Sequence, residues 1–263
     1  MTREERWILD EKYGGNVTGA ESEAFRADCE RLKSGEPTAY IIGSIPFLHT
    51  KIYLDSRPLI PRPETEFWVE KAIEHITHMT PQAPRVLDLC AGSGAIGVAV
   101  AKAIPDAHIT FGEIDSTHMD TIKKNIRENL IIYDKILNSS DNIISKNRFT
   151  LVVSDLFEHI TGTFDFILSN PPYIDKDAHT VEQSVSNFEP HKALFGGRFG
   201  IELIETIIAK APAYLTVRGE LWLEHEPAQT AAIAALAQQH GLTATVHNDQ
   251  YNVARYSDLR VSQ

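Results

Sequence analysis

The sequence predicts an α/β protein with a mostly parallel sheet and helices on both faces. From Pro84 onward, short apolar strands alternate with helical segments, and this alternation is typical of right-handed strand–helix–strand units. Glycine, proline or polar turns separate the segments. The chain has 263 residues, 43% of them hydrophobic, so it can bury a substantial core.

The expected elements of this region follow in regular order. Apolar strands are expected at 85–89, 108–114, 151–154, 164–169 and 220–224, and helices at 95–103, 118–130, 201–215 and 228–240. Two further segments, 244–248 and 253–260, predict a terminal hairpin.

Residues 1–45 predict a small helical domain in front of the sheet. Thr18 and Glu21 have the spacing of a capping box at a helix start. Gly35 can end that helix. The domain can serve as a structural cap, as a docking lobe for a partner, or as both.

The chain between this domain and the sheet has a different character. Residues 40–43 and 51–54 are expected to form short strands, so that 46–62 make a β-hairpin linker. A proline-rich turn then leads into a helix, and the principal domain is expected to cover 63–263.

Composition and charge exclude several classes of function. The formal net charge is -11, which does not suit a large nucleic-acid interface but does suit a cationic protein partner. No apolar run approaches the roughly 20 residues that span a bilayer, so we expect no membrane contact and a cytoplasmic location. Cys29 and Cys90 lack metal-ligand spacing, so no metal site is expected. We expect a monomer.

A ligand-binding loop is expected where the strand at 85–89 ends. Small residues follow Asp88 up to the next helix, namely Cys90, Ala91, Gly92, Ser93 and Gly94. Ligands bind at the carboxyl ends of such strands, and a helix N-terminus offers free N–H donors. Cys90 replaces the first glycine of G-x-G-x-x-G, which disfavours a dinucleotide oxidoreductase. Asp88 suits a methyltransferase better, since its carboxylate can orient the loop or a ligand ammonium. A tight turn without a ligand is the alternative.

Two further strand ends supply candidate cofactor contacts. Glu113 can accept hydrogen bonds from ribose hydroxyls, with Asp115 as a rival. Asp155 can bind an adenine amino group while Leu156 or Phe157 packs on the ring. The alternative is an ordinary helix cap at Asp155 beside core packing.

The segment after the strand at 164–169 is the most specific in the chain: Asn170, Pro171, Pro172 and Tyr173. Two prolines stiffen the turn, so that the Asn170 side-chain carbonyl and the Pro171 carbonyl can face one NH2 group. Two acceptors would hold a poorly nucleophilic nitrogen in line with a methyl sulfonium and stabilise the developing positive charge. Tyr173 offers an aromatic face to a flat group. This pattern predicts N-methylation of a planar amide or amine, with a merely stiffened connection as the alternative.

Together these motifs resemble the peptide chain release factor glutamine N5-methyltransferases, the HemK-type family. The resemblance runs from about Gly35 to the C-terminus. It is carried by the segments 35–43, 59–66, 86–97, 164–174, 188–190, 193–197 and 223–225 and by Gln229. The proline-rich segment 59–66 is its most diagnostic part, because generic methyltransferases lack it.

The resemblance implies a Rossmann-like class I methyltransferase with a mostly parallel seven-stranded sheet, a small N-terminal helical domain and a β-hairpin. The implied cofactor is S-adenosyl-L-methionine, which leaves as S-adenosyl-L-homocysteine. The implied partner and substrate is a release factor, methylated on the glutamine of its Gly-Gly-Gln motif. Cofactor contacts are implied for the loop 90–94, Glu113, Leu156 and Asn170. Contacts with the substrate are implied for 170–173 and expected for Arg62 and Glu189.

The chain departs from the family in three places. Cys90 and Ala91 replace the usual Gly-Thr, Glu113 stands where Asp is usual, and the N-terminal part is short.

Other substrates and functions stay open at this point. Asn-Pro-Pro-Tyr also occurs in adenine-N6 methyltransferases of DNA and RNA, because adenine presents a similar NH2 group. A glutamine of a ribosomal protein and a catalytically silent cofactor-binding module are further alternatives. The acidic charge and the proline-rich segment favour a protein substrate, and the intact loop 170–173 argues against a silent module.

Overall fold

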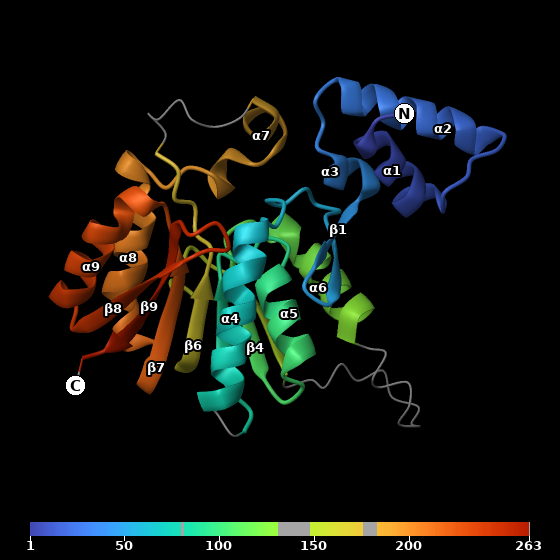
Figure 1. Cartoon of the computed structure of the whole chain (residues 1–263). Helices are drawn as coiled ribbons and strands as arrows, with labels where there is room; N and C mark the ends of the chain where they lie inside the picture. The colour runs from blue at the N-terminus through green and yellow to red at the C-terminus, as the bar shows by residue number, and fades with distance from the viewer. Residues whose placement is uncertain (80–81, 131–147, 176–182, 263) are drawn as a thin grey trace, which may run out of the picture.

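The structure is a computed structural model that describes residues 1–79, 82–130, 148–175 and 183–262. A small helical lobe at the N-terminus lies beside a larger α/β domain (Figure 1). The lobe contains α1 (Arg3–Tyr13), α2 (Ala20–Lys33) and α3 (Thr38–Ile42). Within the described residues, no helix is both long and apolar enough to cross a membrane.

Two predictions for this lobe are wrong. The capping box is formed by Thr2 and Glu5 at the start of α1, whereas Thr18 bonds to Glu21 only through its backbone carbonyl. Residues 40–43 are not a strand, because they belong to α3 and its C-cap. Gly43 ends this helix in the left-handed conformation at φ 87°. Tertiary burial of Ala39, Tyr40 and Ile41 outweighs the strand preference of the aromatic and β-branched residues, and Ala39 and Tyr40 belong to the core shared with the α/β domain.

The β-hairpin consists of β1 (Ser44–Phe47) and β2 (Thr50–Tyr53), which pair antiparallel. Two asparagines four residues apart on α6 (Met119–Leu130) complete the hydrogen bonds of β2. Asn125 binds both the N–H and the carbonyl of Tyr53, and Asn129 does the same for Lys51. The outer edge of the hairpin is therefore satisfied by side-chain amides, which join it to the α/β domain.

The seven-stranded sheet has the order β5-β4-β3-β6-β7-β9-β8. Its strands are β3 (Arg85–Leu89), β4 (His108–Glu113), β5 (Phe149–Val153), β6 (Phe164–Ser169), β7 (Leu215–Glu224), β8 (Leu242–Asn248) and β9 (Ala254–Val261). Strands β3, β4, β5, β6 and β7 run parallel to one another, and β9 runs antiparallel to its neighbours β7 and β8. The predicted mostly parallel sheet and terminal hairpin are confirmed.

Helices cover both faces of the sheet (Figure 1). On one face, α4 (Pro63–Met79), α5 (Ala95–Ala103) and α6 enclose a core that includes Val86 and Phe111. On the other face, α8 (Glu202–Lys210) and α9 (Thr230–Gln239) pack over Leu87 and Leu221. The expected helix 201–215 is shorter, because a 3-10 turn at Ala211–Ala213 leads into β7. The short helix α7 (Gln183–Phe188) lies above the sheet.

The register of the parallel strands brings the chemistry-bearing residues to one edge. Leu89 pairs with Ser169, and Ser169 pairs with Leu223. The next residues along the chain therefore emerge side by side, at the carboxyl edge where such sheets bind ligands.

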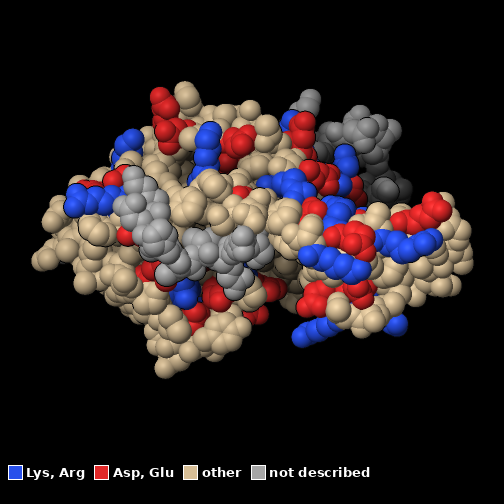
Figure 2. All heavy atoms as spheres, turned by 90° about the horizontal axis from the view of Figure 1, so that it is seen from above, with Lys and Arg blue, Asp and Glu red and all other residues tan. Residues whose placement is uncertain are grey.

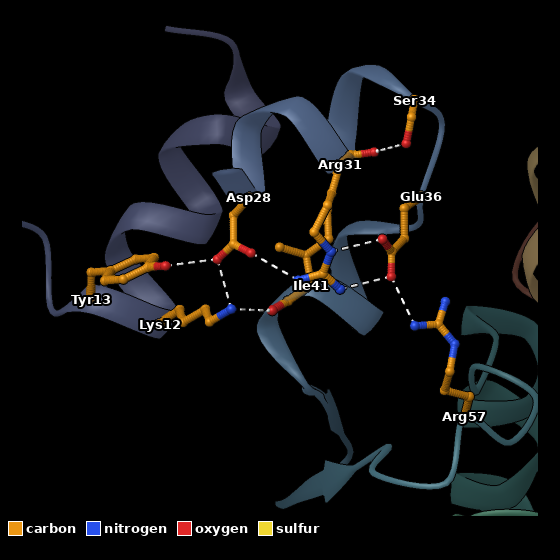
Figure 3. A network of polar contacts seen from close by, with 8 residues as sticks. All are labelled: Lys12, Tyr13, Asp28, Arg31, Ser34, Glu36, Ile41 and Arg57. Carbon is orange, nitrogen blue, oxygen red and sulfur yellow. Dashed lines mark hydrogen bonds and ion pairs between the residues drawn. The ribbon is translucent and has the colours of Figure 1, made fainter. Parts of the chain in front are cut away.

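Two carboxylates organise the helical lobe. Asp28 accepts hydrogen bonds from Lys12 Nζ at 2.6 Å, from the Tyr13 hydroxyl at 2.8 Å and from Arg31 Nη1 at 2.8 Å (Figure 3). These partners come from α1 and α2, so a single buried carboxylate joins both helices. The hydrogen bonds keep the pKa of Asp28 below its ordinary value in spite of its burial.

The second carboxylate joins the lobe to the chain that follows the hairpin. Glu36 binds Arg31 through both of its oxygens and Arg57 through Oε1, each at 2.8 Å (Figure 3). The Arg57 guanidinium also lies 4.3 Å from the ring centroid of Tyr40, whose hydroxyl donates to the Pro58 carbonyl at 2.7 Å. The lobe is thus anchored to residues 57–58, which directly precede the proline-rich segment 59–66.

Candidate active site

The turn after β3 is tight and unusual in its backbone. Cys90, Gly92 and Gly94 all have left-handed conformations, with φ of 63°, 54° and 77°. The Ala91 N–H donates to the Gly112 carbonyl, and the Ser169 hydroxyl donates to the Leu89 carbonyl at 2.8 Å. The predicted cofactor loop is therefore fixed both to β4 and to the start of the Asn-Pro-Pro-Tyr loop.

Asp88 lies beneath this loop. Its side chain is fully buried, and Oδ2 accepts the Gly97 N–H at 2.8 Å, which satisfies one of the free donors in the first turn of α5. Burial raises the pKa of Asp88 to about 8. Oδ1 has no hydrogen-bond partner among the described residues. The structure thus places Asp88 where it holds the loop in position.

Glu113 lies at the end of β4 with both oxygens engaged by backbone. Oε2 accepts the Gly92 N–H and Oε1 accepts the Asp115 N–H, each at 2.8 Å. A carboxylate has about four lone-pair sites, so each oxygen can accept one further hydrogen bond. Asp115, the rival, accepts from the backbone and the hydroxyl of Thr117, and these bonds lower its pKa. Both carboxylates thus keep lone pairs for a ligand, and of the two only Glu113 is tied directly to the cofactor loop, through Gly92.

The three residues after β5 that could contact an adenine, Asp155, Leu156 and Phe157, differ in burial and in their contacts. Leu156 is buried in a left-handed conformation with φ 48°, held by the Ser154 hydroxyl, which donates to its carbonyl at 2.8 Å. Phe157 stacks on Tyr214 with ring centroids 4.5 Å apart, so it belongs to the core. Asp155 is exposed. Leu156 and Phe157 belong to the same core cluster, and Leu156, 8% exposed against 1% for Phe157, is the one that keeps some apolar surface free.

The Asn-Pro-Pro-Tyr loop contains the two oxygens that the sequence analysis expects to act as acceptors, Asn170 Oδ1 and the Pro171 carbonyl. Asn170 Nδ2 donates to Thr65 Oγ1 at 3.0 Å. No residue in the described parts of the chain donates to Asn170 Oδ1 or to the Pro171 carbonyl. Pro171 and Pro172 are buried and offer no N–H. Neither oxygen is occupied by a residue that the structure describes.

Tyr173 is held by its hydroxyl and by its backbone. The hydroxyl donates to Glu224 Oε1 at 2.8 Å, and the carbonyl accepts Gln229 Nε2 at 2.8 Å. A Cβ at Gly200 would collide with the same carbonyl oxygen, so only glycine allows this close approach. Burial raises the pKa of Tyr173, which stays a neutral donor.

Sequence reasoning did not identify the carboxylate behind this loop. Glu224 is fully buried and accepts hydrogen bonds from Thr65 Oγ1 at 2.7 Å, Trp68 Nε1 at 2.6 Å and Tyr173. Burial raises the pKa of Glu224, which these hydrogen bonds oppose. Two signals were present: Glu224 lies in the segment 223–225 that carries part of the family resemblance, and it directly ends the apolar run Leu221–Leu223 of an inner strand.

Arg62 and Glu189, both expected to bind substrate, lie against each other. Arg62 Nη2 and Glu189 Oε1 are 2.6 Å apart, and Glu189 Oε2 accepts the Ile60 N–H at 3.0 Å. The Glu189 side chain is 1% exposed, whereas that of Arg62 is 30% exposed. The pair fixes the proline-rich segment to the chain after α7, and only Arg62 retains substantial solvent contact.

Comparisons with known proteins address the family and the fold of the chain. A family described as "Methyltransferase small domain" matches residues 72–191. The release factor glutamine methyltransferase of Rhodopirellula baltica is 36% identical over 229 residues, 85% of this chain and 73% of that protein. That of Xylella fastidiosa is 34% identical over 229 residues, 87% of this chain and 77% of the relative.

A solved structure shows that the fold is shared more widely. The ribosomal protein L11 methylase from Lactobacillus delbrueckii subsp. bulgaricus has a TM-score of 0.51 at 14% identity and covers 76% of this chain and 79% of its own. Identity above 30% over most of both chains is the stronger finding. The protein belongs to the release factor glutamine methyltransferase family.

Proposed function

We propose that this protein transfers a methyl group from S-adenosylmethionine to the side-chain amide nitrogen of the glutamine in the Gly-Gly-Gln motif of a peptide chain release factor. One observation carries the proposal. Asn170 Oδ1 and the Pro171 carbonyl, neither with a donor among the described residues, sit at a strand end beside the candidate cofactor loop. The names of its relatives support the same substrate.

The residues around the loop fit S-adenosylmethionine. Glu113 has lone pairs left for the two ribose hydroxyls, and the small residues 90–94 let the backbone approach a ligand. Leu156 offers an apolar surface for the adenine. When bound, the cofactor supplies an electrophilic methyl group on a sulfonium.

The residues of this chain supply orientation and charge stabilisation. An amide nitrogen is a poor nucleophile because its lone pair is delocalised into the carbonyl. Acceptors at Asn170 and Pro171 would hold the two hydrogens of the NH2 group and fix the nitrogen in line for attack. The same oxygens stabilise the positive charge that grows on nitrogen as the bond forms. A strong base is unnecessary, because the N–H becomes acidic as the methyl group arrives.

Charge is consistent with a protein substrate. The formal net charge is -11, and Lys and Arg alternate with Asp and Glu over the face seen in Figure 2. Nucleic-acid binding favours a continuous basic surface. A release factor takes part in translation, so this substrate would place the enzyme in the cytoplasm.

The experiment uses purified protein, tritiated S-adenosylmethionine and a purified bacterial release factor. We expect label in the release factor and none in a variant whose Gly-Gly-Gln glutamine is replaced by alanine. Ribosomal protein, rRNA and DNA are included as competing acceptors. Label in any of these, or in the glutamine-free release factor, would overturn the proposal.

A further inference from the structure

The hydrogen bonds that link Glu224, Thr65 and Asn170 all have a defined donor and acceptor. An ionised Glu224 can only accept hydrogen bonds, and it is the acceptor for Thr65 Oγ1 at 2.7 Å. A hydroxyl has a single hydrogen. Once Thr65 gives that hydrogen to Glu224, its oxygen can only accept, and the group within reach is the side chain of Asn170 at 3.0 Å.

This direction decides which end of the Asn170 amide faces the substrate. The oxygen and nitrogen of an asparagine amide have nearly the same shape, so packing alone does not distinguish the two orientations. Thr65 distinguishes them, because only the NH2 end can donate to it. Oδ1 is then turned away from Thr65. With the amide reversed, an NH2 group would face the NH2 of the substrate, and neither could accept.

We propose that Thr65 and Glu224 are positioning residues that set the orientation of the Asn170 amide and so keep its oxygen available to the substrate NH2. The inference rests on the proposed function, since it needs a substrate that donates from nitrogen. Neither residue is assigned contact with the substrate or cofactor.

Burial keeps water from replacing this arrangement. Thr65 is 3% exposed and Glu224 is fully buried. Trp68, whose N–H can only donate, and Tyr173 supply two further donors to Glu224, and three donors favour its ionised form, which can only accept from Thr65. Thr65 lies in the first turn of α4, so the proline-rich segment that starts this helix also places the hydroxyl between Glu224 and Asn170.

The test compares two substitutions of nearly equal size to threonine. Thr65→Val keeps the shape and removes the hydroxyl, whereas Thr65→Ser keeps the hydroxyl. We expect Thr65→Val to lower kcat at least about tenfold, the effect of losing one ordinary hydrogen bond in the transition state, with KM for both substrates changed less than about threefold. We expect Thr65→Ser to keep kcat within about threefold of the wild type. Thr77→Val is the matched control, because Thr77 is exposed on the same helix and, among the described residues, its hydroxyl bonds only to the Ile73 carbonyl.

Urea unfolding and calorimetric titration with S-adenosylmethionine show whether each variant is folded and binds cofactor. If Thr65→Val does not fold, Thr65→Ala removes the same hydroxyl without adding a methyl group and is read in the same way. Wild-type kcat in the folded hydroxyl-free variant would overturn the inference, as would equal losses in the valine and serine variants. A wild-type enzyme that fails to label the release factor would instead refute the proposed function, independently of any variant.

Discussion

Asn170→Ala separates catalysis from folding, because Asn170 contributes little to stability. Its side chain is half-buried and makes one hydrogen bond among the described residues, to Thr65. Losing a single hydrogen bond of this kind costs about 1 kcal/mol of unfolding free energy. Removing one preorganised partner of a charge that develops in the transition state costs about 100- to 1000-fold in kcat.

The assay combines initial rates with tritiated S-adenosylmethionine, calorimetric titration of the cofactor and urea unfolding. We expect kcat to fall by about 100-fold or more while the cofactor dissociation constant stays within about fivefold. Asn170→Gln is the matched control, since it keeps the amide and displaces it by one methylene, and it should also lose activity. A turnover rate for Asn170→Ala close to that of the wild type would refute the catalytic assignment.

Three other substitutions test separate parts of the structure. Glu36→Gln removes the charge that binds two partly exposed arginines, and urea unfolding should show a loss of about 1–3 kcal/mol in unfolding free energy. An unchanged unfolding midpoint would contradict the role of Glu36 in anchoring the lobe. The pKa of Asp88 is about 8 in the folded protein against an ordinary value of 3.8, so the unfolded chain releases this proton first. The contribution of Asp88 to stability is therefore greatest below pH 3.8 and declines as pH rises to about 8, by at most about 1.4 kcal/mol per pH unit. Asp88→Asn should flatten the profile of unfolding free energy against pH. Parallel profiles for the wild type and the variant would refute this assignment. Tyr173→Phe keeps the aromatic face but removes one donor to Glu224, so kcat should fall less than about tenfold while stability drops by about 1 kcal/mol; a loss as large as that of Asn170→Ala would assign the hydroxyl a direct role.

Much of the sheet could be predicted, because its strands are apolar runs bounded by glycine, proline or polar turn residues. The strand 85–89 and the helix 95–103 occur with the predicted bounds, and so does the strand 164–169. In each case the local pattern and the tertiary burial agree. The prediction for 40–43 was wrong because local pattern and tertiary burial disagree there. Tyr-Ile-Ile favours a strand locally, but these residues are buried as a helix that Gly43 ends.

The candidate site could be predicted only where its residues are neighbours in sequence. The loop 170–173 and the turn 90–94 are continuous, so their spacing is visible before any fold is known. Thr65 and Glu224 are 159 positions apart, and neither has a recognisable partner nearby in the chain. The contact between them depends on where α4 crosses β7, which the periodicity of neither element specifies.

The strand register explains how the local loop 170–173 and the distant residue Glu224 come together. Ser169 pairs with Leu223, so the residues that follow them, Asn170 and Glu224, must emerge at adjacent positions of the carboxyl edge. A slip of one residue would turn Glu224 to the opposite face, among the apolar side chains that pack against α8 and α9. The apolar residues 221–223 on one strand and 166–168 on the other therefore do more than fill the core. By fixing the register, they bring an acceptor-only carboxylate to the side of the loop where it can set the direction of the Asn170 amide.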